Sequence, residues 1–349
     1  RKYLVQKNNE IFQSQKLLTN TKKFLITGGA GFIGSHIVDG LVDKCNDVVI
    51  VDDLRTGRRE NINPSSLVRF YETDICNFDE LKRVFEYEKP DVVLHLAANP
   101  MLRKSLEDPI YDASVNILGT INVLECCRLN KVRKIIYTST GGARVGEPEY
   151  LPVDEEHPLN PCSPYGISKH SAEHYVEMFG KNYSLDYLIF CFGNVYGPRD
   201  DVETKRLVPV FAEMMLNGES PNIFGDGEQT RDFIYVKDLA NFIVDSVDKE
   251  PKSKLFHLAN GKQISVNYVC GLLKEYTGFE GEIKHAEVIQ GEVRDIVLDI
   301  KRVREELGWN PETSIEEGLK RSVEWFKGER LKDEELSTQT KKVFKMKSV

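Results

Sequence analysis

The chain has 349 residues, of which 40% are hydrophobic and 29% are charged, as in an ordinary globular protein. Its net charge of −8 gives no electrostatic reason to expect nucleic acid or an anionic membrane surface as a partner. No apolar run approaches the ~20 residues of a membrane span. The seven scattered cysteines contain no C-x-x-C pair, which predicts reduced thiols and a cytoplasmic location.

The predicted elements begin after a polar N-terminal extension, residues 1–22, in which no signal-peptide core is recognisable. From there short β-rich runs alternate with amphipathic helical stretches. This alternation predicts an α/β fold with a doubly wound parallel sheet of the Rossmann type. The predicted strands are Phe24–Thr27, Asp47–Val51, Leu67–Glu72, Val92–Leu96, Lys134–Thr138 and Tyr187–Phe192.

After Gly197-Pro198 the pattern changes to loops, short helices near 208–217 and 236–247, and short strands near Ile223, Phe256 and Ile283. We therefore predict a dinucleotide-binding domain over 23–197, with an element returning to it around 230–262. A smaller α/β C-terminal substrate lobe would cover 198–330, followed by a charged tail over 331–349.

A glycine-rich turn follows the first predicted strand and opens a helix. Its sequence, Gly28-Gly29-Ala30-Gly31-Phe32-Ile33-Gly34, allows a tight turn and a close approach of the backbone to a pyrophosphate at the helix N-terminus. No Lys-Ser/Thr pair follows, which excludes a P-loop. The turn predicts cofactor contacts from Gly28, Gly31, Phe32, Ile33 and Gly34.

The second predicted strand ends in two carboxylates, Asp52 and Asp53, and Asp52 lies eighteen residues after Gly34 (52 − 34 = 18). A carboxylate there accepts hydrogen bonds from both ribose hydroxyls and repels a 2′-phosphate, which favours NAD over NADP. Three arginines follow closely in the sequence, at positions 55, 58 and 59, so NADP stays an alternative cofactor. Later strand ends add the predicted cofactor contacts Asp74, Ile75, Leu96, Ala97 and Ala98.

Tyr165 and Lys169 stand four residues apart, so they share one face of a helix. The lysine's positive charge favours the tyrosine's phenolate, whereas an unperturbed phenol, with a pKa near ~10, is a poor base at neutral pH. A Tyr-x-x-x-Lys spacing occurs by chance in many helices. With a dinucleotide site in the same chain, it predicts a general base.

Three further motifs make a resemblance specific: 116–120 (NILGT), 194–198 (NVYGP) and 224–232 (FGDGEQTRD). With the glycine turn and the Tyr–Lys pair, they resemble the extended short-chain dehydrogenase/reductases, and more narrowly the nucleotide-sugar 4-epimerases. The resemblance covers about Lys23 to Lys327. It implies an NAD-dependent UDP-sugar 4-epimerase, an isomerase that works as a homodimer, with Asn116 as a further cofactor contact.

The resemblance also implies roles in catalysis. Tyr165 would take the proton from the sugar's 4-hydroxyl while hydride passes to NAD⁺, and the transient 4-keto sugar would receive the hydride on its other face. Thr140 would position the hydroxyl, and Lys169 would hold the ribose. Dehydratases of this family carry an Asp-Glu pair after Thr140, and decarboxylases a nearby Glu. Gly141-Gly142 stands there instead and favours epimerisation.

The sequence does not identify the sugar of the nucleotide-sugar substrate. UDP-glucose and UDP-galactose are favoured, while Arg144 makes a uronic acid such as UDP-glucuronate worth considering. Ile296 falls at the position that gates the acetamido pocket in the family, so acceptance of UDP-GlcNAc is undecided. The implied substrate-binding residues are Asn194, Arg206, Phe224, Arg231 and Arg294.

Other interpretations compete with this one. The sequence from His170 to His174 spells H-x-x-E-H, an inverted zinc-binding pattern, but its helix already has a role in the dinucleotide interpretation, so we predict no metal. A net redox or dehydratase-type relative and a non-catalytic dinucleotide-binding regulator are the alternative functions. The helices about Asp112–Leu129 and Ser168–Lys181 would form the dimer, although burial in the monomer gives the same apolar pattern.

Overall fold

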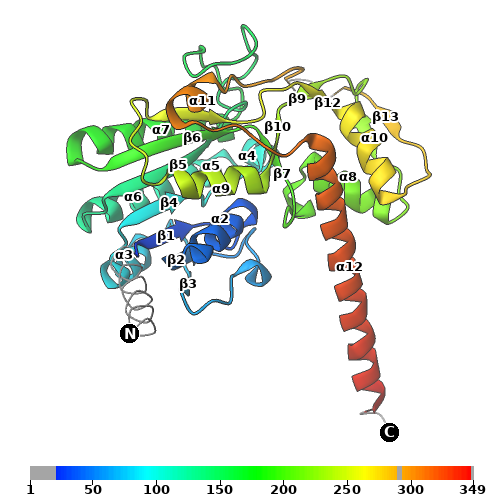
Figure 1. Cartoon of the computed structure of the whole chain (residues 1–349), viewed down its shortest axis with the longest axis horizontal. Helices are drawn as coiled ribbons and strands as arrows, with labels where there is room; N and C mark the ends of the chain where they lie inside the picture. The colour runs from blue at the N-terminus through cyan, green and yellow to red at the C-terminus, as the bar shows by residue number, and fades with distance from the viewer. Residues whose placement is uncertain (1–20, 289–292, 347–349) are drawn as a thin grey trace, which may run out of the picture. The chain divides into compact units, whose positions relative to one another are not determined.

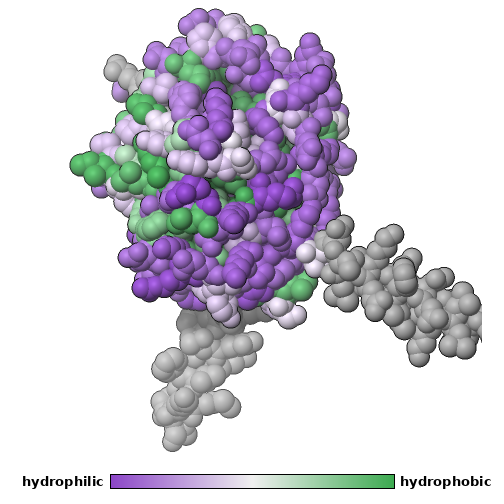
Figure 2. Space-filling view, turned by 90° about the vertical axis from the view of Figure 1, so that its left-hand side faces the viewer, coloured by the Kyte–Doolittle hydropathy of each residue, from purple (hydrophilic) through white to green (hydrophobic). Residues whose placement is uncertain are grey.

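A computed structural model describes residues 21–288 and 293–346 of the chain (Figure 1). The predicted extension therefore falls almost wholly outside the described residues. Within them no helix is long and apolar enough to cross a membrane. Hydrophilic side chains dominate the face seen in Figure 2, and apolar ones gather in smaller patches.

The central element is a seven-stranded sheet with the order β11-β6-β5-β4-β1-β2-β3, flanked by helices (Figure 1). β1 pairs in parallel with β2 and β4, β2 with β3, and β4 with β5. The first six strands thus follow the doubly wound order 3-2-1-4-5-6. The strands are β1 (Lys23–Thr27), β2 (Asp47–Asp52), β3 (Val68–Glu72), β4 (Val92–His95), β5 (Lys134–Thr140), β6 (Asp186–Phe192) and β11 (Leu255–Leu258).

This sheet confirms the predicted fold class, and all six strands predicted before residue 197 are present within two residues of their predicted ends. Their sequences explain why. β2 contains an unbroken β-branched run at residues 48–51 and is buried at five of its six positions, as expected for a parallel strand covered on both faces. The predicted strand near Phe256 is β11, which adds the seventh strand to this sheet.

The chain divides into two compact units. The first unit contains the described residues up to Asn99, Ile110–Thr138 and His170–Ile189. The second contains Pro100–Pro109, Ser139–Lys169 and the described residues from Phe190 onward. The chain therefore passes between the units after Asn99 and within α5 (Pro109–Ala113), β5, α7 and β6. The functional division proposed from sequence, at 197/198, stays a prediction.

Helices of the first unit pack on its strands. α2 packs on β1 and β2, and α3 packs on α6. Asn77 caps α3 by accepting the Glu80 N–H at 3.3 Å, and a π-helical turn precedes α6. The helical elements are α2 (Phe32–Asp43), η1 (Arg59–Asn61), α3 (Phe78–Glu88), α5 (Pro109–Ala113), η2 (Ser114–Gly119), α6 (Thr120–Leu129) and α7 (Pro164–Tyr183), which continues from the second unit.

The second unit has its own core, built around Tyr196, Tyr235, Leu273 and Leu319. Its strands pair as β7–β10, β9–β12 and β8–β13. Its helices are α4 (Leu102–Glu107), η3 (Val202–Thr204), α8 (Leu207–Leu216), α9 (Val236–Ser246), α10 (Val266–Thr277), α11 (Lys301–Leu307) and α12 (Ile315–Met346). Its short strands are β7 (Asn194–Tyr196), β8 (Asn222–Phe224), β9 (Thr230–Arg231), β10 (Phe233–Tyr235), β12 (Ile264–Ser265) and β13 (Lys284–Ala286). The predicted tail, 331–349, is thus helical through Met346.

Candidate active site

The glycine turn has the geometry of a dinucleotide cradle. Gly28 has φ +73°, and a Cβ there would stand 2.7 Å from the Ala97 N, so only glycine fits. A Cβ on Gly34 would stand 2.1 Å from the Gly28 carbonyl oxygen. A Cβ on Gly31 would meet only that same oxygen, at 3.2 Å. The space in front of Gly31 is therefore open at the N-terminus of α2, where a pyrophosphate binds in this kind of turn.

Asp52 is joined to the same turn. Its Oδ2 accepts the Ala30 N–H at 3.0 Å, and its Oδ1 accepts the Leu54 N–H at 2.9 Å. Burial raises the pKa of this carboxyl, and the two backbone hydrogen bonds oppose that shift. A carboxylate has further lone pairs, so Asp52 keeps acceptor capacity for ribose hydroxyls.

Arg55, which follows the two acidic residues, is already bound within the first unit. Its Nη2 lies 2.7 Å from Asp74 Oδ2, its Nε lies 3.2 Å from Asp53 Oδ2, and its Nη1 donates to the Tyr111 hydroxyl at 2.7 Å. Asp53 and Asp74, both predicted cofactor contacts, are thus brought together by one guanidinium. An NADP phosphate would have to compete with three partners for Arg55.

The predicted contacts at the end of β4 are held by a buried chain of hydrogen bonds. The Leu96 N–H donates to the Thr27 carbonyl at 3.0 Å, and the Ala97 N–H donates to Thr27 Oγ1 at 3.2 Å. Thr27 Oγ1 also lies 2.6 Å from His95 Nδ1, and His95 Nε2 lies 2.9 Å from Thr120 Oγ1. Sequence reasoning missed Thr27 and His95, because no motif marks them.

Asn116, a predicted cofactor contact, continues this chain from the π-helical turn. It accepts the Asn99 N–H at 2.8 Å and donates to Asp112 Oδ1 at 2.9 Å. Thr120 Oγ1 donates to the Asn116 carbonyl at 2.7 Å. Asn116 is 1% exposed and hydrogen-bonds to the backbone at Asn99, after β4. It can therefore hold the predicted cofactor-binding segment in place without touching the ligand itself. Ile75, also predicted, packs where a side chain on Gly119 would clash.

The predicted catalytic residues lie in the second unit. α7 begins at Pro164, and Ser163 Oγ accepts the Gly166 N–H at 3.1 Å, which caps its first turn. Tyr165 is half-buried and Lys169 is 4% exposed. The Tyr165 N–H donates to Ser105 Oγ at 3.2 Å, a contact from α4 that no sequence pattern predicts.

Thr140 is linked to the start of α7 through Ala143. Thr140 Oγ1 accepts the Ala143 N–H at 3.4 Å. The Ala143 carbonyl oxygen lies so close to Gly166 that a Cβ on that glycine would stand 2.1 Å away. The loop that follows Thr140 is therefore in direct contact with the first turn of α7, which carries Tyr165.

Gly141 and Gly142 have a steric role in addition to the chemical one inferred from sequence. A Cβ on Gly141 would stand 2.3 Å from a methyl of Leu298. A Cβ on Gly142 would stand 3.5 Å from Ile296 Cγ1. The predicted acetamido gate, Ile296, thus lies beside the glycine pair that follows Thr140, and it is 5% exposed.

Two of the five predicted substrate residues are placed by backbone pairing or an ion pair. Asn194 begins β7 and is exposed, and its N–H donates to the Asp232 carbonyl at 2.6 Å. The Arg206 Nε donates to Asp200 Oδ1 at 2.8 Å. Asp200 is 3% exposed, and burial raises its pKa to about 6 even though Arg206 opposes the shift. The positive charge of Arg206 therefore partly compensates for the burial of the Asp200 carboxyl group.

Of the other three predicted substrate residues, Phe224 and Arg231 flank the loop between β8 and β9, and Arg294 contacts that loop from a later part of the chain. Phe224 ends β8 and is 41% exposed. Arg231 lies in β9, and its Nη1 donates to the carbonyls of Thr230 and Arg294 at 2.8 and 3.0 Å. The Arg294 Nη2 lies 3.0 Å from Asp226 Oδ2. The structure thus brings Arg231 and Arg294 together, and Arg294 also forms an ion pair with the loop at Asp226.

Arg144, the reason for considering a uronic acid, is buried at 4% exposure, and its Nη1 donates to Cys191 Sγ at 2.9 Å. It also lowers the pKa of the buried His257, after burial itself, to about 3. The side chain is thus part of the interior of the second unit.

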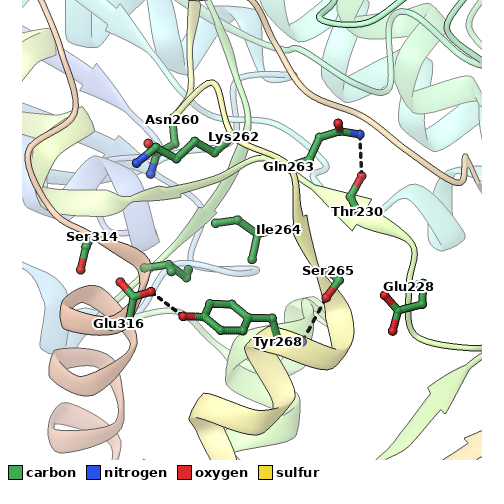
Figure 3. A pocket seen from close by; sticks show the side chains of 11 residues that line it. Glu228, Thr230, Asn260, Lys262, Gln263, Ile264, Ser265, Tyr268, Ser314 and Glu316 are labelled. Carbon is green, nitrogen blue, oxygen red and sulfur yellow. Dashed lines mark hydrogen bonds between the residues drawn. The ribbon is translucent and has the colours of Figure 1, made fainter.

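A cavity of about 500 Å³ lies elsewhere in the second unit (Figure 3). Tyr268 donates to Glu316 across it at 2.6 Å, and Gln263 donates to Thr230 at 3.1 Å. None of the predicted site residues lines it.

Among the described residues no group of His, Cys, Asp or Glu is arranged to hold a metal. In the H-x-x-E-H sequence, His170 Nδ1 lies 3.0 Å from Glu173 Oε2.

Comparison with known proteins gives consistent matches. The model of the GDP-mannose 4,6 dehydratase family matches residues 25–322. A putative UDP-glucose 4-epimerase of Methanocaldococcus jannaschii is 45% identical over 304 residues, covering 87% of this chain and 98% of the relative.

Two solved structures match closely in fold. The UDP-glucose 4-epimerase of Thermotoga maritima, determined with UDP-glucose, aligns with a TM-score of 0.84 at 40% identity, over 88% of this chain and 99% of the other. The UDP-glucose 4-epimerase of Thermus thermophilus, in complex with NAD, aligns with a TM-score of 0.82 at 35% identity, over the same shares of the two chains. With its doubly wound sheet, glycine turn and Tyr–Lys helix, the chain therefore belongs to the extended short-chain dehydrogenase/reductase family.

Proposed function

We propose that this protein is an NAD-dependent nucleotide-sugar 4-epimerase that interconverts UDP-glucose and UDP-galactose. The observation that carries the proposal is the spacing of Tyr165 and Lys169 on α7, together with the contact between the first turn of that helix and Ala143, whose N–H donates to Thr140. The match to UDP-glucose 4-epimerases over nearly their whole length supports it.

NAD is the cofactor of this proposal, and when bound it accepts hydride from the sugar and returns it. The glycine turn would hold its pyrophosphate at the N-terminus of α2, with Gly31 leaving the approach open. Asp52 would accept hydrogen bonds from the ribose, and Lys169 would hold the second ribose. The ion pairs of Arg55 support NAD over NADP.

The proton chemistry belongs to Tyr165. Its phenolic oxygen would remove the proton from the 4-hydroxyl and return one to the ketone oxygen after the sugar has turned. The Lys169 ammonium would favour the phenolate form, and Thr140 would orient the hydroxyl by hydrogen bonding. Since the sugar is regenerated with inverted configuration, no net oxidation occurs, and the cofactor is expected to stay bound from one cycle to the next.

Epimerisation is favoured over elimination and decarboxylation because Gly141-Gly142 offers no carboxyl group after Thr140, and at position 141 Leu298 also packs closely where a side chain would stand. The Arg144 guanidinium donates to the buried Cys191 Sγ, which favours a neutral hexose over a uronic acid as the sugar of the substrate. UDP-GlcNAc stays an alternative, since Ile296 is of medium size.

Incubating the purified protein with UDP-galactose and measuring UDP-glucose tests the proposal. Conversion without consumption of added NAD(H) and without loss of water is expected, and Tyr165→Phe should abolish it while leaving UDP binding intact. A panel of UDP-Glc, UDP-GlcNAc and UDP-GlcA identifies the sugar. No conversion of any of these sugars, or an unaffected Tyr165→Phe variant, would refute the proposal.

We also propose a homodimer in the cytoplasm. In the helices expected to form the interface, Val123 and Val176 are fully buried within the first unit, whereas Leu118 is 57% exposed and Leu129 is 44% exposed. The exposed pair supports association, and light scattering tests it. All seven cysteines are free thiols, which supports a reducing compartment.

A further inference from the structure

Arg103 and Phe224 lie against each other in the second unit. The guanidinium carbon of Arg103, on α4, is 5.8 Å from the centre of the Phe224 ring, at the end of β8. A guanidinium at this distance is attracted to the ring. It also keeps N–H donors at its edge for oxygen ligands, because the planar group packs with its face and hydrogen-bonds with its edge. Both side chains are exposed.

Arg103 differs in its charge pairing from two of the predicted substrate arginines. Arg206 is paired with Asp200, and Arg294 with Asp226. Within residues 21–288 and 293–346, Arg103 forms no ion pair with a carboxylate, and its ring contact is with Phe224. An acidic protein that binds a nucleotide diphosphate must gather cations locally, and Arg103 is a cation beside Phe224, one of the implied substrate-binding residues.

The position of Arg103 is fixed from the side of the proposed base. α4 carries Ser105, its one buried residue. Ser105 Oγ accepts the Tyr165 N–H at 3.2 Å and donates to the Leu102 carbonyl at 2.6 Å. α4 is thereby attached to the first turn of α7, and the side chain of Arg103 reaches from this anchored segment to β8.

We infer that Arg103 is a substrate-binding residue, whose guanidinium, supported by Phe224, binds an oxyanion of the nucleotide sugar. The inference rests on the proposed function and adds to it a cation that no family motif marks. The oxyanion is either the diphosphate, common to all UDP-sugars, or the carboxylate of a uronic acid, and the two sources are separable by experiment.

The test compares Arg103→Gln and Arg103→Lys with Lys104→Gln, which removes the next exposed cation of α4. Calorimetry with UDP, UDP-glucose and UDP-glucuronate gives the binding constants, and steady-state kinetics gives KM and kcat. Losing a charged hydrogen bond should weaken binding and raise KM about tenfold in Arg103→Gln, with a much smaller change in kcat. Arg103→Lys should recover part of the loss, and Lys104→Gln should resemble the wild type.

Equal losses for all three ligands would assign the diphosphate, and a loss confined to UDP-glucuronate would assign the carboxylate. Wild-type binding of all three ligands by Arg103→Gln would overturn the inference. UDP binding does not depend on turnover, so a wild type that binds UDP and epimerises nothing would refute the proposed function while still testing Arg103.

The pairing itself is tested by a double-mutant cycle with Phe224→Leu. If Phe224 supports the guanidinium, the double variant should bind UDP more tightly than the sum of the two single losses predicts, because each single change already disturbs the same contact. Strictly additive losses would show that the two side chains act independently. An unchanged melting temperature in Arg103→Gln separates lost binding from lost folding.

Discussion

Thr27 Oγ1 lies 2.6 Å from His95 Nδ1, so the residue before the glycine turn is hydrogen-bonded to the last residue of β4. Thr27 also accepts the Ala97 N–H, and Thr120 Oγ1 donates to the Asn116 carbonyl. The consistent assignment of protons is therefore from Thr27 to His95 Nδ1 and from His95 Nε2 to Thr120. One buried chain thus joins the two strand ends that should carry the cofactor.

Thr27→Val should remove the hydrogen bonds that Thr27 Oγ1 forms in this buried chain. Valine has nearly the shape of threonine but leaves His95 Nδ1 and the Ala97 N–H without this partner, so we expect a loss of about 2 kcal/mol in the free energy of unfolding. Co-purifying nucleotide should decrease as well, which is measured by acid extraction and absorbance. Thr21→Val, at an exposed position, is the control. Wild-type stability and nucleotide content in Thr27→Val would contradict a structural role for the chain.

Gly31→Ala and Gly34→Ala should separate ligand binding from folding. Gly31 has φ −78°, which alanine adopts freely, so the free energy of unfolding should change by less than about 1 kcal/mol. The added methyl group would enter the open space in front of α2 and weaken NAD binding by at least about tenfold, since it blocks charged hydrogen bonds to the backbone. Isothermal calorimetry and denaturant unfolding measure the two effects.

Gly34→Ala is the matched contrast. Its methyl group would stand 2.1 Å from the Gly28 carbonyl oxygen, so the variant should lose stability even without NAD, by roughly 1–3 kcal/mol or more. Equal behaviour of the two alanine variants would mean that the turn has no open ligand side.

The parts of this fold that could be predicted from sequence are those with a local cause. β2 reads as a β-branched run, and the turn at Gly28 needs a positive φ that only glycine adopts readily, so both are visible in a short window of residues. The spacing of Tyr165 and Lys169 is equally local. Each of these elements is present in the structure.

The parts that could not be predicted depend on contacts between distant residues. Ser105 and Tyr165 are 60 residues apart, and a single serine in a short helix carries no pattern. Arg206 is a predicted substrate-binding residue, and only the folded chain places Asp200 against it. Whether Arg206 also binds substrate stays a prediction.

Ile296→Ala should widen the range of sugars. Ile296 lies beside Gly142, and removing three of its carbons should raise kcat/KM for UDP-GlcNAc relative to UDP-glucose by about tenfold or more, as expected for methylene-sized changes in a pocket. Leu298→Ala is the control, because it leaves a similar cavity beside Gly141. An equal change in both variants would mean that Ile296 does not select the sugar.

Glu88 should make stability depend on pH. Its carboxylate is 2% exposed and accepts from Arg69 Nε at 2.8 Å, from the Tyr71 hydroxyl at 2.7 Å and from Lys23 Nζ at 3.2 Å. Burial raises the pKa of Glu88, but these hydrogen bonds outweigh burial and lower it from 4.5 to about 2. Since the folded state holds the proton more weakly than the unfolded state, this stabilisation is fully present above about pH 4.5 and is lost as the pH falls through about 2.

Glu88→Gln should therefore lose about 2 kcal/mol of unfolding free energy at pH 7, because an amide cannot accept all of these charged hydrogen bonds. The gap between wild type and variant should be smaller at pH 3, because this pH lies between the two pKa values and the wild type has already lost part of the same contribution. Urea unfolding at pH 7, 5 and 3 measures it. Glu86→Gln removes an exposed carboxylate of the same helix, 3.8 Å from Lys82, and should change stability by less than about 0.5 kcal/mol at every pH. Because every other group titrates alike in wild type and variant, a gap that stays constant from pH 7 to pH 3 would mean that Glu88 does not have the low pKa that its partners impose.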